Sequence, residues 1–204
     1  MKRILFLTAI LFFVSLTLLA QKRAFTIEDL YKVKNVGSPV ISPTGSKIAF
    51  TVTDYNLQEG KSNSDIYILY PDGATENISS KDVSETDPFW GSDNEIYFLN
   101  GGQVYRYTFN DRKTSQVTDF ATGISNASLT PDKKSIVFIS EVFPECGADN
   151  FCNKNLSESS ANGPVQAYMT DELMFRHWTE YNGEKKTSLI SYSLQSNSYQ
   201  FLAQ

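Results

Sequence analysis

Short apolar segments alternate with polar turns along most of the chain, and one such pattern recurs. Residues 42–50, 90–98 and 129–138 each contain a short apolar strand, a polar turn and a second strand that ends in an aromatic residue. These aromatics, Phe50, Phe98 and Phe138, follow one another at intervals of about 40 to 50 residues. In each unit the pattern predicts two further short strands, at residues 65–69 and 75–78, 104–107 and 114–117, and 189–192 and 199–202.

Four short strands in each repeated unit are typical of β-propeller blades. We therefore predict an all-β fold, a partial β-propeller of about three four-stranded blades. A generic antiparallel sandwich is the alternative, but it gives no reason for one turn-and-strand pattern to recur three times. Propellers usually close with about four to eight blades, so the repeat predicts the front part of a larger protein.

Two segments interrupt the repeat. Residues 26–31 predict a short helix, with Thr26 as its cap and acidic residues in its first turn. Residues 141–186 form an insertion between the second and third strands of the third unit. Within it, the polar residues 153–163 predict a loop, and the apolar spacing over 168–178 predicts a helix, which makes the insertion partly helical. Long insertions on a rigid scaffold are commonly functional.

The first 20 residues predict export. Lys2 and Arg3 precede an uncharged, mainly apolar run over residues 4–20, which has the shape of a secretory signal peptide. We therefore expect residues 1–20 to be a signal peptide and residues 21–204 to act in the periplasm or outside the cell. An uncleaved membrane anchor is the alternative, and it would be the chain's only contact with a membrane.

Charge and cysteine content narrow the function classes. The formal net charge of −5 disfavours a nucleic-acid partner, whose phosphates would be repelled. The two cysteines, Cys146 and Cys152, lie close together in the insertion. In an exported chain such a pair predicts a disulfide in preference to a metal site.

The sequence contains no complete catalytic site, and we predict no cofactor and no metal. It has neither a Gly-x-Ser-x-Gly nucleophile turn nor a glycine-rich phosphate loop, and His177 is its single histidine. The acidic pairs Asp149-Asn150 and Asp171-Glu172 are a calcium alternative, but one pair falls far short of the six or more oxygens that calcium requires.

Several stretches resemble the prolyl oligopeptidase family. They include Ala24-Phe25-Thr26-Ile27-Glu28-Asp29-Leu30 at the start and, in the insertion, Val142-Phe143-Pro144-Glu145-Cys146 and Leu173-Met174-Phe175-Arg176-His177-Trp178. The insertion stretches resemble the dipeptidyl-peptidase-V-like and acylaminoacyl-peptidase branch. In that family a propeller caps a carboxy-terminal α/β-hydrolase domain bearing Ser, Asp and His. This chain ends before such a domain, so no catalytic residue is carried over.

The resemblance implies the amino-terminal propeller segment of an exported serine dipeptidyl peptidase that gates and recognises its peptide substrate. By analogy, Glu172 binds the substrate ammonium, and Arg176 orients it or binds a substrate carbonyl, since residues four apart share one face of a helix. The alternative is that Glu172 and Arg176 pair with each other and only brace the insertion. A homodimer is expected for the parent enzyme. A stand-alone TolB-like propeller that binds protein partners is the alternative, and a non-functional remnant is the third hypothesis.

Overall fold

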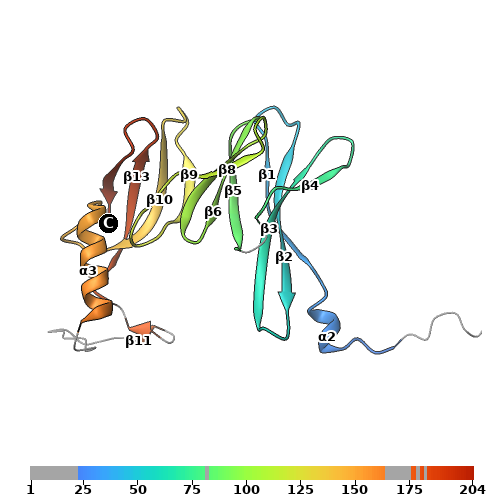
Figure 1. Cartoon of the computed structure of the whole chain (residues 1–204), viewed down its shortest axis with the longest axis horizontal. Helices are drawn as coiled ribbons and strands as arrows, with labels where there is room; N and C mark the ends of the chain where they lie inside the picture. The colour runs from blue at the N-terminus through green and yellow to red at the C-terminus, as the bar shows by residue number, and fades with distance from the viewer. Residues whose placement is uncertain (1–22, 81–82, 164–175, 178–179, 182) are drawn as a thin grey trace, which may run out of the picture.

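The computed structural model describes residues 23–80, 83–163, 176–177, 180–181 and 183–204. Three four-stranded antiparallel sheets lie side by side, and each is one propeller blade (Figure 1). Blade 1 contains β1 (Asn35–Ile41), β2 (Ile48–Asn56), β3 (Lys61–Leu69) and β4 (Thr75–Asn77). Blade 2 contains β5 (Glu85–Ser92), β6 (Glu95–Asn100), β7 (Gln103–Thr108) and β8 (Lys113–Gln116). Blade 3 contains β9 (Ser125–Leu129), β10 (Ser135–Val142), β13 (Lys186–Ser193) and β14 (Ser198–Ala203). The predicted fold class, a partial all-β propeller, is confirmed.

The repeated sequence pattern corresponds to a β-bulge that recurs in each blade. In every blade the first strand carries a β-bulge, and two residues of that strand face a single aromatic residue of the second. Ser38-Pro39 lies opposite Phe50, Asp87-Pro88 opposite Phe98, and Asn126-Ala127 opposite Phe138. A bulge bends and twists its strand locally. The recurring aromatic therefore marks the position where each blade bends.

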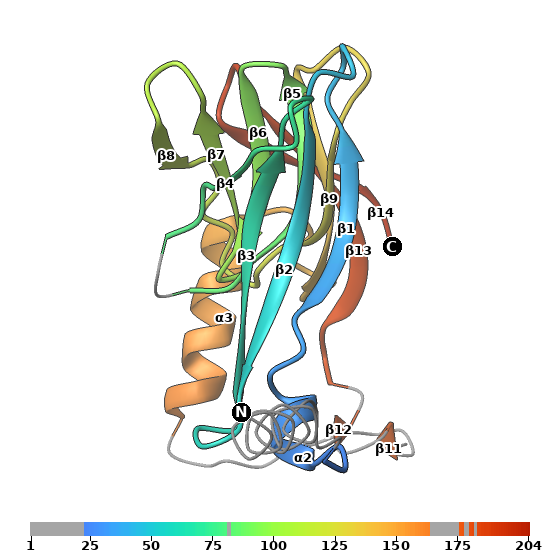
Figure 2. The ribbon, with the colours of Figure 1, turned by 90° about the vertical axis from the view of Figure 1, so that its right-hand side faces the viewer.

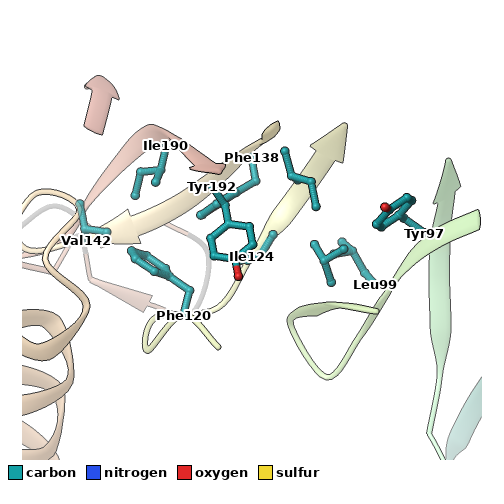
Figure 3. Close-up of a cluster of buried hydrophobic side chains, with 10 residues drawn as sticks. Tyr97, Leu99, Phe120, Ile124, Phe138, Val142, Ile190 and Tyr192 are labelled. Atoms are coloured by element: carbon teal, nitrogen blue, oxygen red, sulfur yellow. The ribbon is translucent and has the colours of Figure 1, made fainter. Parts of the chain in front are cut away.

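Apolar side chains fill the spaces between consecutive blades. Between blades 1 and 2, Ile66 and Ile68 pack with Ile96 and Phe98, all of them fully buried. A second cluster joins blades 2 and 3 and includes Tyr97, Leu99, Phe120, Ile124, Phe138, Val142, Ile190 and Tyr192 (Figure 3). Each fully buried side chain of this size contributes roughly 1.5–3 kcal/mol by leaving water. The blades are thus held together by continuous cores.

Hydrogen bonds between blades 1 and 2 fix how these two blades are oriented relative to each other. The Asp93 carboxylate of blade 2 accepts hydrogen bonds from the Thr44 hydroxyl at 2.6 Å and the Thr44 backbone N–H at 3.3 Å. Lys47 donates to the Asp93 carbonyl at 2.6 Å and lies 4.5 Å from the Phe109 ring centroid. The Trp90 indole N–H donates to the Val40 carbonyl at 3.1 Å, which links β5 directly to β1.

The short predicted helix is present as α2 (Ile27–Leu30), with Thr26 as its N-cap residue. The Asp29 carboxylate accepts from the Thr26 backbone N–H at 3.1 Å and forms an ion pair with Arg23. The Arg23 guanidinium, followed by the Thr26 N–H, holds the pKa of Asp29 well below its usual range. Tyr31 then packs edge-on against Tyr55 near the end of β2, at 6.4 Å between ring centroids, which ties α2 to blade 1.

Candidate functional site

The insertion of blade 3 begins with a helix where the sequence predicted a loop. Helix α3 covers Asn150–Asn162, so the loop prediction for residues 153–163 is wrong over nearly all of that range. Asp149 is the N-cap residue, and its carboxylate accepts from the Cys152 backbone N–H at 2.9 Å. The Asn- and Ser-rich composition concealed this helix. Asp149 was the signal that could have revealed its start.

A buried asparagine fixes the turn between β10 and α3. Asn153 is fully buried, and its side-chain oxygen accepts from the Phe143 backbone N–H at 3.1 Å. Its amide nitrogen donates to the carbonyls of Gly147 at 3.0 Å and Asp149 at 2.8 Å. One side chain thus bonds three backbone groups of the turn, among them the buried Phe143 N–H. Sequence reasoning missed this residue.

A disulfide joins Cys146 to Cys152 across the same turn, with their Cα atoms 5.5 Å apart. The first turn of α3 is therefore tied covalently to the segment that leaves β10. Asp149, half of one predicted acidic pair, serves here as a helix cap. In the part of the chain that the structure describes, no group of three or more His, Cys, Asp or Glu side chains is arranged to hold a metal ion.

Asn150 connects the insertion to the segment between blades 2 and 3. Its side-chain oxygen accepts from the Ala121 backbone N–H, and its amide donates to the Asp119 carbonyl, both at 2.7 Å. The Asp119 backbone N–H in turn donates to the Tyr199 hydroxyl at 3.0 Å. Burial raises the pKa of Tyr199, against the opposing effect of that N–H. The base of the insertion is thus hydrogen-bonded to the segment between blades 2 and 3, which is itself bonded to β14.

Of the two predicted substrate-binding residues, Glu172 and Arg176, the structure describes only the backbone of Arg176. Glu172 lies outside the described residues, as does most of the predicted helix over 168–178. The backbone of Arg176 lies in a short strand, β11 (Arg176–His177), which pairs with β12 (Glu180–Tyr181). The helix prediction is therefore wrong at residues 176 and 177. Aromatic and β-branched residues surround this point, and such residues favour extended backbone.

The insertion shares one end of the molecule with α2. Figures 1 and 2 both show α2, the β11–β12 hairpin, the tip of the long β2–β3 hairpin and the last turns of α3 at that end. The same end carries the exposed apolar side chains of Phe25, Ile27, Leu30 and Leu57. We call this the α2 end. It brings together the two segments that interrupt the repeat.

None of the helices in the described ranges is both long and apolar enough to cross a membrane. The predicted signal peptide over residues 1–20 lies outside those ranges.

Curated relatives of this chain are peptidases. It is 23% identical over 192 residues to a dipeptidyl-peptidase 4 of Giardia intestinalis, a match that covers 81% of this chain and 25% of the relative. It is 22% identical over 169 residues to a dipeptidyl-peptidase 5 of Porphyromonas endodontalis, covering 79% of this chain and 23% of the relative. No family model matches the sequence.

Solved structures agree on the fold. An acylaminoacyl peptidase of Pyrococcus horikoshii superposes on 88% of this chain with a TM-score of 0.64, at 14% sequence identity and over 26% of its own length. The chain is homologous to the amino-terminal propeller region of prolyl oligopeptidase family peptidases. The chain spans about a quarter of the length of the curated relatives it matches.

The sequence contains no Gly-x-Ser-x-Gly turn and a single histidine, and we assign no catalytic residue to it. What the geometry offers is a rigid base for the insertion, built from Asn150, Asn153 and the disulfide. A rigid base of this kind can hold recognition residues at a fixed place relative to the blades.

Proposed function

We propose that this chain is the amino-terminal propeller segment of an exported serine dipeptidyl peptidase, where it gates access to the catalytic domain and recognises the amino end of the peptide. The carrying observation is the match to dipeptidyl peptidases over most of this chain and only about a quarter of theirs. The hydrolase chemistry of the parent would then be supplied by a domain that this sequence does not include.

The exposed apolar side chains of the α2 end support a contact between this end and the catalytic domain. Phe25, Ile27 and Leu30 are each more than half exposed, at 69%, 63% and 56%. Apolar side chains gathered on one surface are characteristic of interfaces. The insertion reaches the same end from blade 3. In this proposal the α2 end faces the hydrolase domain, and the insertion presents Glu172 and Arg176 towards the active site.

The DNA downstream of this reading frame provides the first test. A continuing frame that encodes a Gly-x-Ser-x-Gly turn in an α/β-hydrolase domain supports the proposal. A stop codon directly after residue 204 would instead favour the stand-alone TolB-like module or the remnant. A fusion of residues 1–30 to a reporter enzyme that is active only outside the cytoplasm tests export. A silent reporter would contradict that part of the proposal.

Glu172→Gln in the full-length parent tests recognition. We expect the KM for dipeptidyl substrates with a free amine to rise about tenfold or more, because a charge-assisted hydrogen bond to the ammonium is lost. Substrates with a blocked amine should be affected much less, since they lack that charge. Glu145→Gln, an exposed glutamate at the start of the same insertion, is the matched control. An equal rise in KM for both substrate types, or no rise for either, would show that Glu172 does not bind the substrate ammonium.

A further inference from the structure

The outermost strand of blade 3, β14, leaves a sheet edge open. Among the described residues it pairs only with β13, so its other edge presents unpaired backbone N–H and C=O groups. Proteins commonly protect such edges with short strands or charged side chains. The outermost strands of blades 1 and 2, β4 and β8, have three and four residues and carry Glu76 and Lys113. β14 has six residues and no charged side chain, and its bulge at Leu202 leaves residues 198–201 regular.

The side chains of β14 also depart from those of its counterparts. Counted outward from the recurring aromatic of each blade, the strand registers give equivalent positions on the three outermost strands. One such set is Asn77, Gln116 and Phe201, and another is Glu76, Ser115 and Gln200. Phe201 is the apolar member of its set, and it is 41% exposed. An exposed aromatic side chain thus stands where the other two blades have a carboxamide.

A blade stacked on the outer face of blade 3 would not cover Phe201. Phe201 lies opposite Ile190, and residues directly opposite each other in an antiparallel pair have their side chains on the same face. Ile190 is fully buried in the cluster between blades 2 and 3, so Phe201 also points to the blade 2 side. There it lies against Gly147 of the insertion, where an added Cβ would be 3.6 Å from the ring. The exposed part of Phe201 therefore faces the rim.

A second exposed aromatic side chain is linked to the same strand. Phe151, in the first turn of α3, is 74% exposed. Its neighbour Asn150 donates to the Asp119 carbonyl, and the Asp119 N–H donates to the Tyr199 hydroxyl of β14. The first turn of α3 is thus connected to β14 through one residue. We call β14 and Phe151 together the blade 3 rim. Exposed apolar groups beside an open sheet edge are characteristic of an interaction surface.

The charge and geometry of the blade 3 rim favour one kind of partner. The chain has a formal net charge of −5, yet β14 carries no charge of either sign. Two copies can therefore meet along this strand without local repulsion. An edge strand placed antiparallel to its own copy is self-complementary, because each strand offers the other the same alternating donors and acceptors. The same two-fold arrangement doubles every apolar contact that Phe201 or Phe151 makes.

We propose that β14 pairs antiparallel with β14 of a second copy of this chain, about a two-fold axis near Gln200, so that blade 3 of each copy joins one continuous sheet. Phe201 and Phe151 flank this contact. The contact is at the rim, so it is separate from the outer blade faces and from the α2 end. It does not depend on the proposed peptidase role, and either can fail without the other.

Charge exchange at Gln200, an exposed residue of β14, tests the pairing. Gln200→Lys places two like charges near the two-fold axis, and Gln200→Glu does the same with the opposite sign. In analytical ultracentrifugation of the purified full chain, we expect each change alone to raise the Kd for dimer formation about fivefold. A one-to-one mixture of the two variants should associate more tightly than either variant alone, since opposite charges then face each other. Ser115→Lys and Ser115→Glu, at the equivalent exposed position of β8, are the matched controls and should have no effect.

Phe201→Gln tests the apolar contribution, because it introduces the residue type that β8 has at the equivalent position. We expect the Kd for dimer formation to rise about tenfold. Thermal unfolding checks that this variant is folded, and the Gln200 variants decide the question if it is not. A mixture no heavier than its separate components would overturn the proposal. So would an equal effect of Ser115→Lys and Gln200→Lys, or an unaltered chain that does not associate.

Discussion

At the scale of single residues, Asn153 fixes the start of the insertion through three hydrogen bonds from one side chain. It is the fully buried residue of α3, and its three hydrogen bonds all go to backbone groups of the turn that begins the insertion. The carboxamide group, with a separate acceptor oxygen and a two-proton donor nitrogen, is shared only by glutamine, which is one methylene longer.

We expect Asn153→Ala to lower the free energy of unfolding by about 2–4 kcal/mol, because the buried Phe143 N–H loses its partner and the carbonyls of Gly147 and Asp149 each lose a hydrogen bond. Asn155→Ala, at an exposed position of the same helix, should change it by less than about 0.5 kcal/mol. Urea denaturation followed by circular dichroism measures both. A similar small effect from the two variants would show that the turn is held by the disulfide and backbone alone.

Sequence reasoning could not have found Asn153, because its importance comes from burial and not from its type. Asparagine is common in exposed loops, and residues 153–163 contain several polar residues of that kind. The helix there is stabilised by its cap, its disulfide and the hydrogen bonds of Asn150 and Asn153, none of which produces an apolar periodicity. Conversely, the strand patterns were readable because alternating burial requires alternating residue types.

At the scale of elements, the turn of blade 1 is joined to the turn of blade 2 through Asp93. The hydrogen bonds from Thr44, followed by those from Ser42 and Ser46, lower the pKa of the Asp93 carboxyl against the effect of burial. A carboxyl whose pKa is lower in the folded state stabilises the fold above its unfolded pKa, and that contribution disappears as the pH falls through the folded value.

Asp93→Asn should therefore flatten the loss of stability as the pH is lowered from about 5 to 2, while lowering stability near neutral pH. Thermal unfolding midpoints recorded across this range measure the effect. Asp111→Asn, in an exposed turn of the same blade, should leave the acid profile unchanged. Parallel profiles for Asp93→Asn and the unaltered chain would mean that this turn contact does not couple to folding.

At the scale of the whole molecule, the three blades form a stack whose two outer faces carry exposed apolar groups. Ile41 of β1 is 66% exposed and Leu189 of β13 is 38% exposed. Both alternate along their strands with side chains that pack between blades, Val40 and Ile190. The outer faces thus resemble the faces that are covered inside the stack.

We expect the 204-residue chain to self-associate through these faces, since uncovered apolar sheet surfaces tend to associate. Replacing Ile41 and Leu189 together by threonine places a β-branched residue, which suits a strand, at both positions and should shift the mass measured by light scattering towards the monomer. Val83→Thr, at an exposed apolar residue between blades 1 and 2, is the control. A chain that is monomeric without any substitution would contradict this expectation.

The position of the insertion also sets an order of folding. In blades 1 and 2, the second and third strands are joined by short turns, whereas in blade 3 Val142 must pair with Lys186 across the whole insertion. Closing that longer loop adds an entropic cost on the order of 2 kcal/mol to the nucleation of blade 3. Blade 3 should therefore acquire protection from hydrogen exchange last, and formation of α3 with its disulfide would shorten the segment that must be closed.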